Sequence, residues 1–507
     1  MRAADLLKFW LRSDDAVRGR IWQRRSATLS GAGAREQREF ERRFRLTAGD
    51  EGVRLGRALG LDSRYGWYGI PYEEAVRLRA WITGTSGGGK TYEVVALLLQ
   101  LLRRPMVLWV FDFKGELSDL LAHTVLPALA GRPEGAWLRG RVHLIDLFGA
   151  APPALRLTEP EQGVPRHVQA LTLSATLQEV LNADHGLRME RVFLMASSLA
   201  IEQRQPLTIL GTWLSSPEVF AQAAARSSDP RIRAYAANTF PREPRASLQA
   251  LSSRLDLLFF LPEIRRAFEA PSCVSFADLT HEGVFLFRVG GAPAGSEAVE
   301  AAIGSLLLGR ATRAIMGRSV TESTLPLLVL LDEGQRAIRA RDVSHLERVL
   351  TQARFKRSSI VFCNQDQSAQ LDPDFARLLR ANTSTEFIFR AGPEDAERLA
   401  RHLPMRLPGK SEDEQRRAIA HQITHLPQRA FILWSKEHGQ ATQLRSPRID
   451  LVALEREAAA LPQAVREQLF AASAMPNMPT PDEADMPGAP FPPIAPIGSD
   501  DDLVGLG

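Results

Sequence analysis

The segment from Gly84 to Thr91 constrains the fold more than any other, because it fits the pattern G-x-x-x-x-G-K-[ST]. Its glycines let the backbone turn tightly, so that successive N–H groups and the start of the following helix face one point. Lys90 brings a cation to that point and Thr91 a hydroxyl. An apolar lead precedes the segment and an apolar stretch follows it, which predicts a strand, a phosphate-binding loop and a helix in succession. The predicted nucleotide-binding residues here are Gly84, Thr85, Ser86, Gly87, Gly88, Gly89, Lys90 and Thr91.

A second motif supports this interpretation and argues against a chance glycine-rich loop. The apolar run 327–331 ends in two acids, Asp332 and Glu333. Taken alone, the pattern also fits a buried strand with a capping acid. Beside a phosphate-binding loop it predicts that Asp332 and Thr91 hold Mg²⁺ and that Glu333 polarises the attacking water. The two motifs together predict an enzyme that hydrolyses ATP, with ATP and Mg²⁺ as cofactors, and the adjacent glutamate disfavours a small-molecule kinase.

Strand and helix patterns alternate around these motifs, which predicts an α/β fold with a mostly parallel sheet covered on both faces. The stretch 158–268 differs, because it holds helical periodicity with few strand candidates. Strands are expected at 107–111, 142–145, 284–289, 327–331, 359–363, 386–389, 429–435 and 441–445. Helices are expected at 92–102, 168–181, 189–202, 218–226, 230–238, 246–258, 297–315 and 342–355.

These patterns divide the chain into six predicted parts. An N-terminal helical segment spans 1–52, and the P-loop NTPase domain comprises 53–157 and 269–450, with an all-α domain inserted at 158–268. A C-terminal helix is expected at 451–470. The last part, 471–507, contains eight prolines and six acidic residues, and we expect a disordered tail there.

Charge and cysteine content bear on partners and location. All 63 Lys and Arg residues precede Ala471 while six of the 59 acids follow it, which leaves a net charge of +10 on residues 1–470. A polyanionic partner fits that charge, but so does an Arg-rich composition with no such partner. Two cysteines, Cys273 and Cys363, lack metal-type spacing, and no apolar run reaches the roughly 18 residues of a membrane span. A cytoplasmic location is expected.

The segment Phe111-Asp112-Phe113-Lys114-Gly115-Glu116 resembles the Asp-Pro-Lys-Gly-Glu segment of type IV secretion coupling proteins, with Phe113 in place of the proline. Those proteins belong to the FtsK–HerA group of hexameric DNA translocases. The helical insert between the two motifs and the segment 359–365 also resemble that family. The resemblance covers roughly residues 53–450 and implies a RecA-like P-loop NTPase fold.

The resemblance also implies roles for individual residues. Asp112 would line the nucleotide site from the second strand, with Lys114 and Glu116 nearby. Gln365 would sense the γ-phosphate, although a polar strand end is the alternative. Arg354 would be an arginine finger that reaches the ATP of a neighbouring subunit, although most basic residues in 354–357 are expected at the surface.

By the same resemblance, the chain is expected to form a hexamer and to move or deliver DNA through backbone contacts. Coupling proteins typically begin with a transmembrane anchor, which this sequence does not contain. A membrane or secretion-channel protein could then place it peripherally at the inner membrane, or it could be a HerA-like motor partnered with a nuclease. The alternative from another class is a nucleotide-switched adaptor that recruits protein substrates through the insert or the tail.

Overall fold

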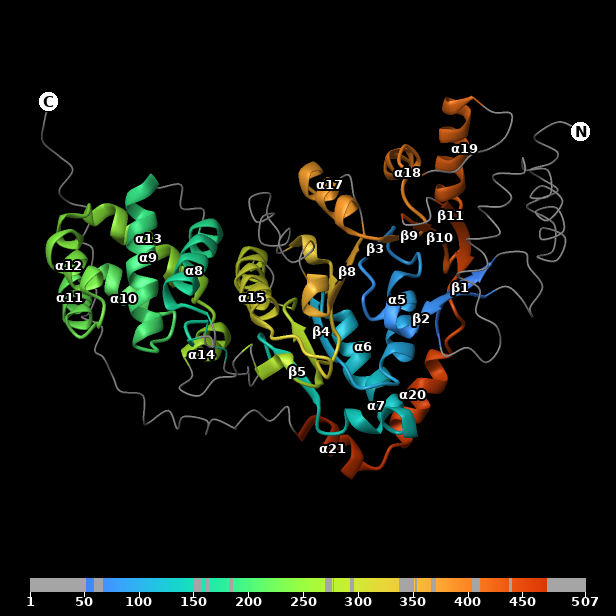
Figure 1. The fold of residues 1–507 in the computed structure, drawn as a ribbon, viewed down its shortest axis with the longest axis horizontal. Coiled ribbons are helices and arrows are strands. Elements are labelled where there is room, and N and C mark those ends of the chain that lie inside the picture. The colour runs from blue at the N-terminus through green and yellow to red at the C-terminus, as the bar shows by residue number, and fades with distance from the viewer. Residues whose placement is uncertain are drawn as a thin grey trace, which may run out of the picture. The chain divides into compact units, whose positions relative to one another are not determined.

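We describe the protein from a computed structural model (Figure 1). The structure describes residues 52–58, 67–149, 155, 157–160, 164–181, 186–269, 276, 278–291, 296–336, 351, 353–365, 371–403, 411–436 and 440–471. The N-terminal segment and the acidic tail predicted from the sequence therefore lie outside the described residues, apart from their boundary positions.

An 11-stranded sheet organises the chain, in the order β2-β1-β11-β10-β9-β3-β8-β7-β4-β6-β5. Its larger part is parallel, as the alternation of strands and helices predicts, and the predicted pair near the C-terminus is the antiparallel ladder β10–β11. The parallel strands are β3 (Ala80–Thr83), β4 (Val107–Asp112), β5 (Val142–Asp146), β6 (Gly283–Arg288), β7 (Leu327–Asp332), β8 (Ser358–Asn364) and β9 (Thr385–Ile388). The antiparallel strands are β1 (Gly52–Ala58), β2 (Trp67–Pro71), β10 (Ala430–Ser435) and β11 (Gln440–Arg445).

The sheet is buried on both faces because its strands are apolar at successive positions. In β4, Leu108 and Val110 point into one core, whereas Trp109 and Phe111 point into the other. Helices that follow β3 and β4 supply the first core, and later helices supply the second. The first set includes α5 (Lys90–Leu101), α6 (Glu116–Leu120) and α7 (Leu126–Ala130), and the second includes α15 (Glu297–Gly317) and α17 (Pro373–Asn382).

Between residues 158 and 268 the described residues form helices and no strand (Figure 1). They share one apolar core with the α15 face of the sheet. Arg310 of α15 is fully buried and donates to the carbonyl of Glu159 over 2.8 Å, which ties this segment to the sheet-covering helix. The helices are α8 (Arg166–Val180), α9 (Gly186–Glu202), α10 (Ile209–Ser215), α11 (Pro217–Ala225), α12 (Pro230–Asn238), α13 (Arg245–Leu258) and α14 (Pro262–Glu269).

Several helices depart from the sequence expectation. Residues 451–470 form two helices, α20 (Leu451–Ala460) and α21 (Gln463–Ala471), because Pro462 disfavours helical backbone at the residue before it. Of the helix expected at 342–355, residues 342–350 lie outside the described part, and a 3₁₀ turn, η6 (Ala353–Lys356), closes the stretch. The polar helices α18 (Pro393–Ala400) and α19 (Glu412–Thr424) were not anticipated, and they pack on a small separate core. None of the described helices has the length and apolar content to cross a membrane.

Candidate active site

The phosphate-binding loop lies at the carboxyl end of β3, in the middle of the sheet. Thr83 pairs with Asn364 of β8, and on the next strands Asp332 pairs with Cys363 and with Asp112. Parallel strands end at the same edge, so the loop and the carboxylates come together there. One strand, β8, separates β3 from β7, which places the loop and the acids about 10 Å apart. That separation leaves room for a phosphate group between them.

The glycines of the loop have the backbone that the motif requires. Gly84, Gly87 and Gly89 all have positive φ, at 148°, 72° and 115°. A side chain on Gly84 would meet Phe389 at 2.6 Å, and one on Gly89 would meet the backbone of Arg429 at 2.9 Å. Only glycine satisfies both requirements without a shift of the neighbouring strand ends.

Lys90 is the first residue of α5 and only 8% of it is exposed. Its Nζ donates to the carbonyls of Gly84 and Thr85, at 2.6 and 3.1 Å, so the ammonium is held inside the loop. Burial lowers the pKa of Lys90, and the nearby charge of Glu333 opposes that shift. An ammonium held here can turn from the carbonyls to an incoming phosphate.

Asp332 lies in a buried, negatively charged environment at this strand edge. Burial, followed by the neighbouring charges of Asp112 and Glu333, raises the pKa of Asp332 to about 7. Lys90 and Lys114 oppose the shift but do not cancel it. The oxygens of Asp112 accept from backbone N–H groups and Oε2 of Glu333 accepts from Gln335, so Asp332 is the carboxylate left to meet a cation, and oxygen is the donor that Mg²⁺ prefers. The residues present therefore fit Mg²⁺, with Asp332 and the exposed hydroxyl of Thr91 as the groups that would hold it.

Glu333 stands in an unusual backbone conformation. Its φ is 55°, a left-handed value that costs a residue with a side chain about 1 kcal/mol or more. Its N–H donates to the carbonyl of Cys363 over 2.9 Å, which fixes the turn. The side-chain amide of Gln335 donates to its Oε2 over 2.5 Å and orients the carboxylate. Backbone strain of this kind is typical of positions that aim a functional group.

Asp112 lies beside Asp332 but is committed to local structure. It is fully buried, and its Oδ1 accepts from the N–H groups of Lys114 and Gly115 at 2.9 and 2.7 Å. Its Oδ2 accepts from the N–H of Ser118 at 2.7 Å. These bonds fix the turn into α6. Asp112 thus acts on the site through its negative charge, while direct nucleotide contact remains a prediction.

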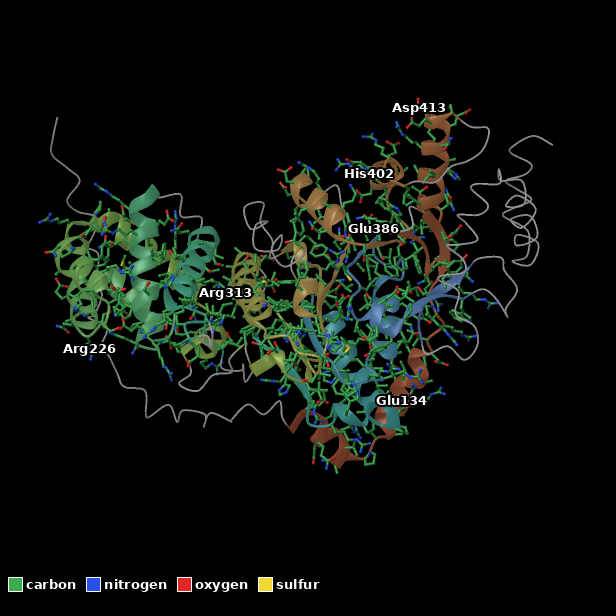
Figure 2. All side chains as sticks on the ribbon, viewed as in Figure 1. Glu134, Arg226, Arg313, Glu386, His402 and Asp413 are labelled. Carbon is green, nitrogen blue, oxygen red and sulfur yellow. The ribbon has the colours of Figure 1, made fainter. Side chains whose placement is uncertain are left out.

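Gln365 directly follows β8, one residue beyond the Asn364–Thr83 pair, so it stands level with the start of the loop. A buried network supports this strand end. The indole of Trp81 donates to Oδ1 of Asn364 over 2.7 Å, and the Arg380 guanidinium stacks over the indole at 5.3 Å. Glu386, labelled in Figure 2, lies 3.8 Å from Arg380. The position agrees with a phosphate sensor, and that role remains a prediction.

Arg354 lies far from the loop of its own chain. It belongs to η6, which precedes β8, and β8 runs for seven residues toward the site. At about 3.3 Å per residue this separation is about 20 Å, beyond the reach of one side chain. Two neighbouring cations of the cluster are structural: Lys356 donates to the carbonyl of Arg318, and Arg357 to that of Glu322. The basic residues expected at 339–341 lie outside the described part of the chain.

Sequence reasoning missed three residues that shape the site. Gln335 holds Glu333. The carbonyl of Arg390 accepts from both the N–H and the hydroxyl of Thr85, at 2.7 and 3.1 Å. The N–H of Arg429 donates to Gly88 over 2.9 Å. At Arg390 and Arg429 the contacts are made by backbone groups, which every residue type can supply, so the sequence could not have indicated them.

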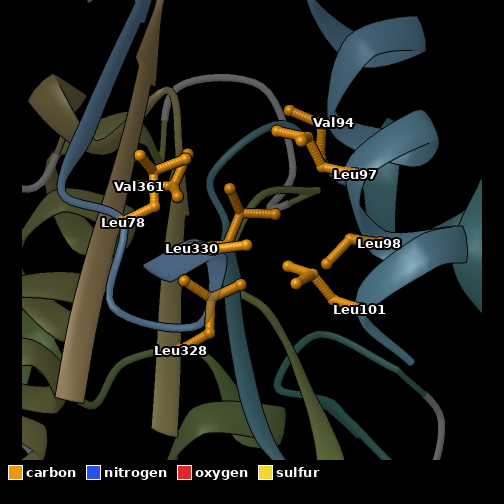
Figure 3. A pocket seen from close by; sticks show the side chains of 9 residues that line it. Leu78, Val94, Leu97, Leu98, Leu101, Leu328, Leu330 and Val361 are labelled. Atoms are coloured by element: carbon orange, nitrogen blue, oxygen red, sulfur yellow. The ribbon is translucent and has the colours of Figure 1, made fainter. Parts of the chain in front are cut away.

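A small apolar cavity lies between α5 and the sheet (Figure 3). Its volume is about 10 Å³, too small for a nucleotide. Leu97, Leu98 and Leu101 approach it from the helix, and Leu328 and Leu330 from the strand that carries Asp332. The site for the phosphates is therefore the loop and strand edge, not this cavity.

No family model matches the chain, and no curated protein matches its sequence. Solved structures do match its fold. VirB4 of Thermoanaerobacter pseudethanolicus superposes with a TM-score of 0.54 at 14% identity, covering 80% of this chain and 98% of that one. The plasmid coupling protein TrwB in complex with the ATP analogue ADPNP gives a TM-score of 0.52 at 16% identity, covering 83% and 93%. TrwB in complex with ADP and Mg²⁺ gives 0.51 at 15% identity over the same shares. The chain thus has the RecA-like P-loop NTPase fold of VirB4 and of coupling proteins, as the sequence predicts.

Proposed function

We propose that this chain is an ATP-hydrolysing motor that assembles into a ring, most simply a hexamer, and translocates or delivers DNA. The observation that carries the ATPase part is the meeting of the Lys90 loop with Asp332 and the strained Glu333 at one sheet edge. Lys90 and the loop N–H groups bind the phosphates, and Thr91 and Asp332 would hold Mg²⁺. When bound, Mg²⁺ neutralises developing negative charge on the phosphates. Glu333 takes the proton of the attacking water.

The ring part of the proposal rests on the position of Arg354. Because about 20 Å of β8 separates it from its own loop, a finger at this position can serve only a site on another subunit. The DNA part rests on the net charge of +10 on residues 1–470 and on fold likeness to TrwB, a conjugative coupling protein.

One observation favours the adaptor alternative. On α13 and just after it, Leu257 and Phe260 are 66% and 76% exposed. Large apolar side chains at the surface suit a protein partner. A substrate protein or a secretion-channel protein could dock there, and such docking is compatible with a motor as well as with an adaptor.

Stimulation of ATP hydrolysis by DNA tests the proposal. Purified protein is assayed alone, with single-stranded DNA and with double-stranded DNA, at low and at physiological salt. The motor predicts a DNA-dependent rate that weakens as salt rises, since backbone contacts release counterions. Hydrolysis that ignores both forms of DNA would favour the adaptor.

A further inference from the structure

A basic groove runs along the outer side of α5, at the helix end far from the phosphates. Its volume is about 760 Å³ and it is open to solvent. The helix rises about 1.5 Å per residue, so the stretch from Lys90 to Arg103 places this end about 20 Å from the phosphate-binding loop. The charged and aromatic lining residues of the groove are Arg54, Trp67, Tyr72, Arg103, Arg104 and Arg448.

All the charged side chains among the described residues that line the groove are positive. Four arginines line it, and none of the described lining residues is acidic. Glu134, labelled in Figure 2, lies 3.8 Å from Arg103, whose side chain is 62% exposed. An exposed pair at that distance is worth little, so the groove keeps its positive potential.

Two of the guanidinium groups are pre-positioned on aromatic rings. Arg54 stacks over Trp67 at 5.2 Å, and Arg104 stacks over Tyr72 at 4.6 Å. Tyr72 is itself fixed, because its hydroxyl donates to the carbonyl of Leu101 over 2.9 Å. A guanidinium held against an aromatic ring is pre-positioned, and its planar fork matches the geometry of phosphate oxygens.

The floor of the groove is rigid. Gln100 of α5 accepts from the N–H of Arg54 at 2.8 Å and donates to its carbonyl at 3.0 Å, so strand β1 is clamped to the helix. An open, rigid and basic groove edged by half-buried aromatic rings is the arrangement that follows the backbone of a single-stranded nucleic acid. A bilayer surface is flat and would not enter it.

We infer that this groove binds single-stranded nucleic acid through its phosphates. The inference deepens the proposed function and rests on it for the identity of the polyanion. It also links the two activities, because α5 joins the groove to Lys90 as one continuous helix. Strand binding at one end can thereby reach the ATP site at the other.

The test compares two double variants with equal charge loss. The groove variant is Arg103→Ala with Arg448→Ala, and the control is Arg398→Ala with Arg416→Ala on α18 and α19, whose side chains are 48% and 45% exposed. Binding of a fluorescent oligothymidylate of about 20 nucleotides is measured by anisotropy across salt concentrations, beside a polyglutamate peptide. We expect the groove variant to lose about tenfold in affinity and about 1.4 in salt slope, two contacts at about 0.7 each. The control should bind as the wild type does, and all three proteins should share one basal ATPase rate.

Each other outcome has a distinct meaning. Equal weakening in both variants, or none in the groove variant, would overturn the groove while leaving a DNA motor intact. Loss of polyglutamate binding with oligothymidylate binding retained would assign the groove to an acidic protein and overturn the inference. A wild-type protein that binds no oligothymidylate would overturn the groove, and the DNA part of the proposed function would fall with it only if double-stranded DNA also failed to stimulate hydrolysis.

Discussion

Replacing Glu93 with glutamine should stabilise the protein at neutral and alkaline pH. Glu93 lies in the first turn of α5 and is fully buried. Neither carboxylate oxygen has a hydrogen-bond partner among the described residues. Burial raises the pKa of Glu93 to about 8, while the nearby Ser446 hydroxyl acts in the opposite direction. The folded chain therefore holds a proton there that the unfolded chain releases.

The magnitude follows from linkage between proton binding and folding. An acid whose pKa is raised on folding contributes most stability below its unfolded pKa of 4.5, and that stability is lost as pH rises to about 8. At about 1.36 kcal/mol per pH unit, the loss at pH 7 is about 3 kcal/mol. Glutamine keeps the shape of the neutral acid and removes the titration, so Glu93→Gln should lose this pH dependence.

Urea unfolding at pH 5.5, 7 and 8 measures the difference in free energy of unfolding between Glu93→Gln and the wild type. The raised pKa of Asp332 also makes stability fall with rising pH, but both proteins share it and the difference cancels it. The stability gap should widen by about 3 kcal/mol from pH 5.5 to pH 8. Glu74→Gln, on an exposed position of α4 (Tyr72–Ala75), serves as the control and should show no such change. A gap that does not vary with pH would refute the reasoning.

Three further predictions concern the loop, the neighbouring subunit and the core. Lys90→Ala should abolish binding of Mg²⁺–ATP in calorimetry, and tight binding by a folded variant would contradict the P-loop assignment. Arg354→Ala should bind ATP normally yet lose about 10³-fold or more in turnover, and unchanged turnover would remove it as a finger. Leu98→Ala, beside the cavity of Figure 3, should lower the free energy of unfolding by about 3 kcal/mol in denaturant titrations. Leu257→Ala, at an exposed position, should stay within about 0.5 kcal/mol of the wild type, and equal losses would refute the packing argument.

Local patterns predicted most of the described strands and many of the helices, because each depends on nearby residues. The expected strand at 327–331 is β7, and the expected helix at 230–238 is α12, which begins at a proline after a capping Asp229. Strand partners were harder to predict. β3 lies between β8 and β9, and its Trp81 bonds a residue 283 positions away. Partner choice over such separations depends on packing of the whole sheet, which a local pattern does not contain.

In the candidate site, too, the sequence predicted what depends on residue type and missed what depends on the three-dimensional arrangement. The motifs named Lys90 and Asp332, because their chemistry requires those residue types. They did not name the Arg390 carbonyl that holds Thr85, since any residue could supply a carbonyl there. The structural bonds of Asp112 were missed for a different reason: a carboxylate after a strand looks alike in sequence whether it meets a ligand or caps a turn.

The central claim is that the Lys90 loop, Asp332 at the end of β7 and Glu333 directly after it form one ATP-hydrolysing centre. Its most direct test is ATP turnover by wild type and Glu333→Gln, with Mg²⁺–ATP binding measured on the same samples. The account predicts that both proteins bind ATP and that the variant loses about 10²-fold or more in turnover, the size typical of a lost general base. Wild-type turnover in the variant, or a wild type that binds ATP and does not hydrolyse it, would contradict the account.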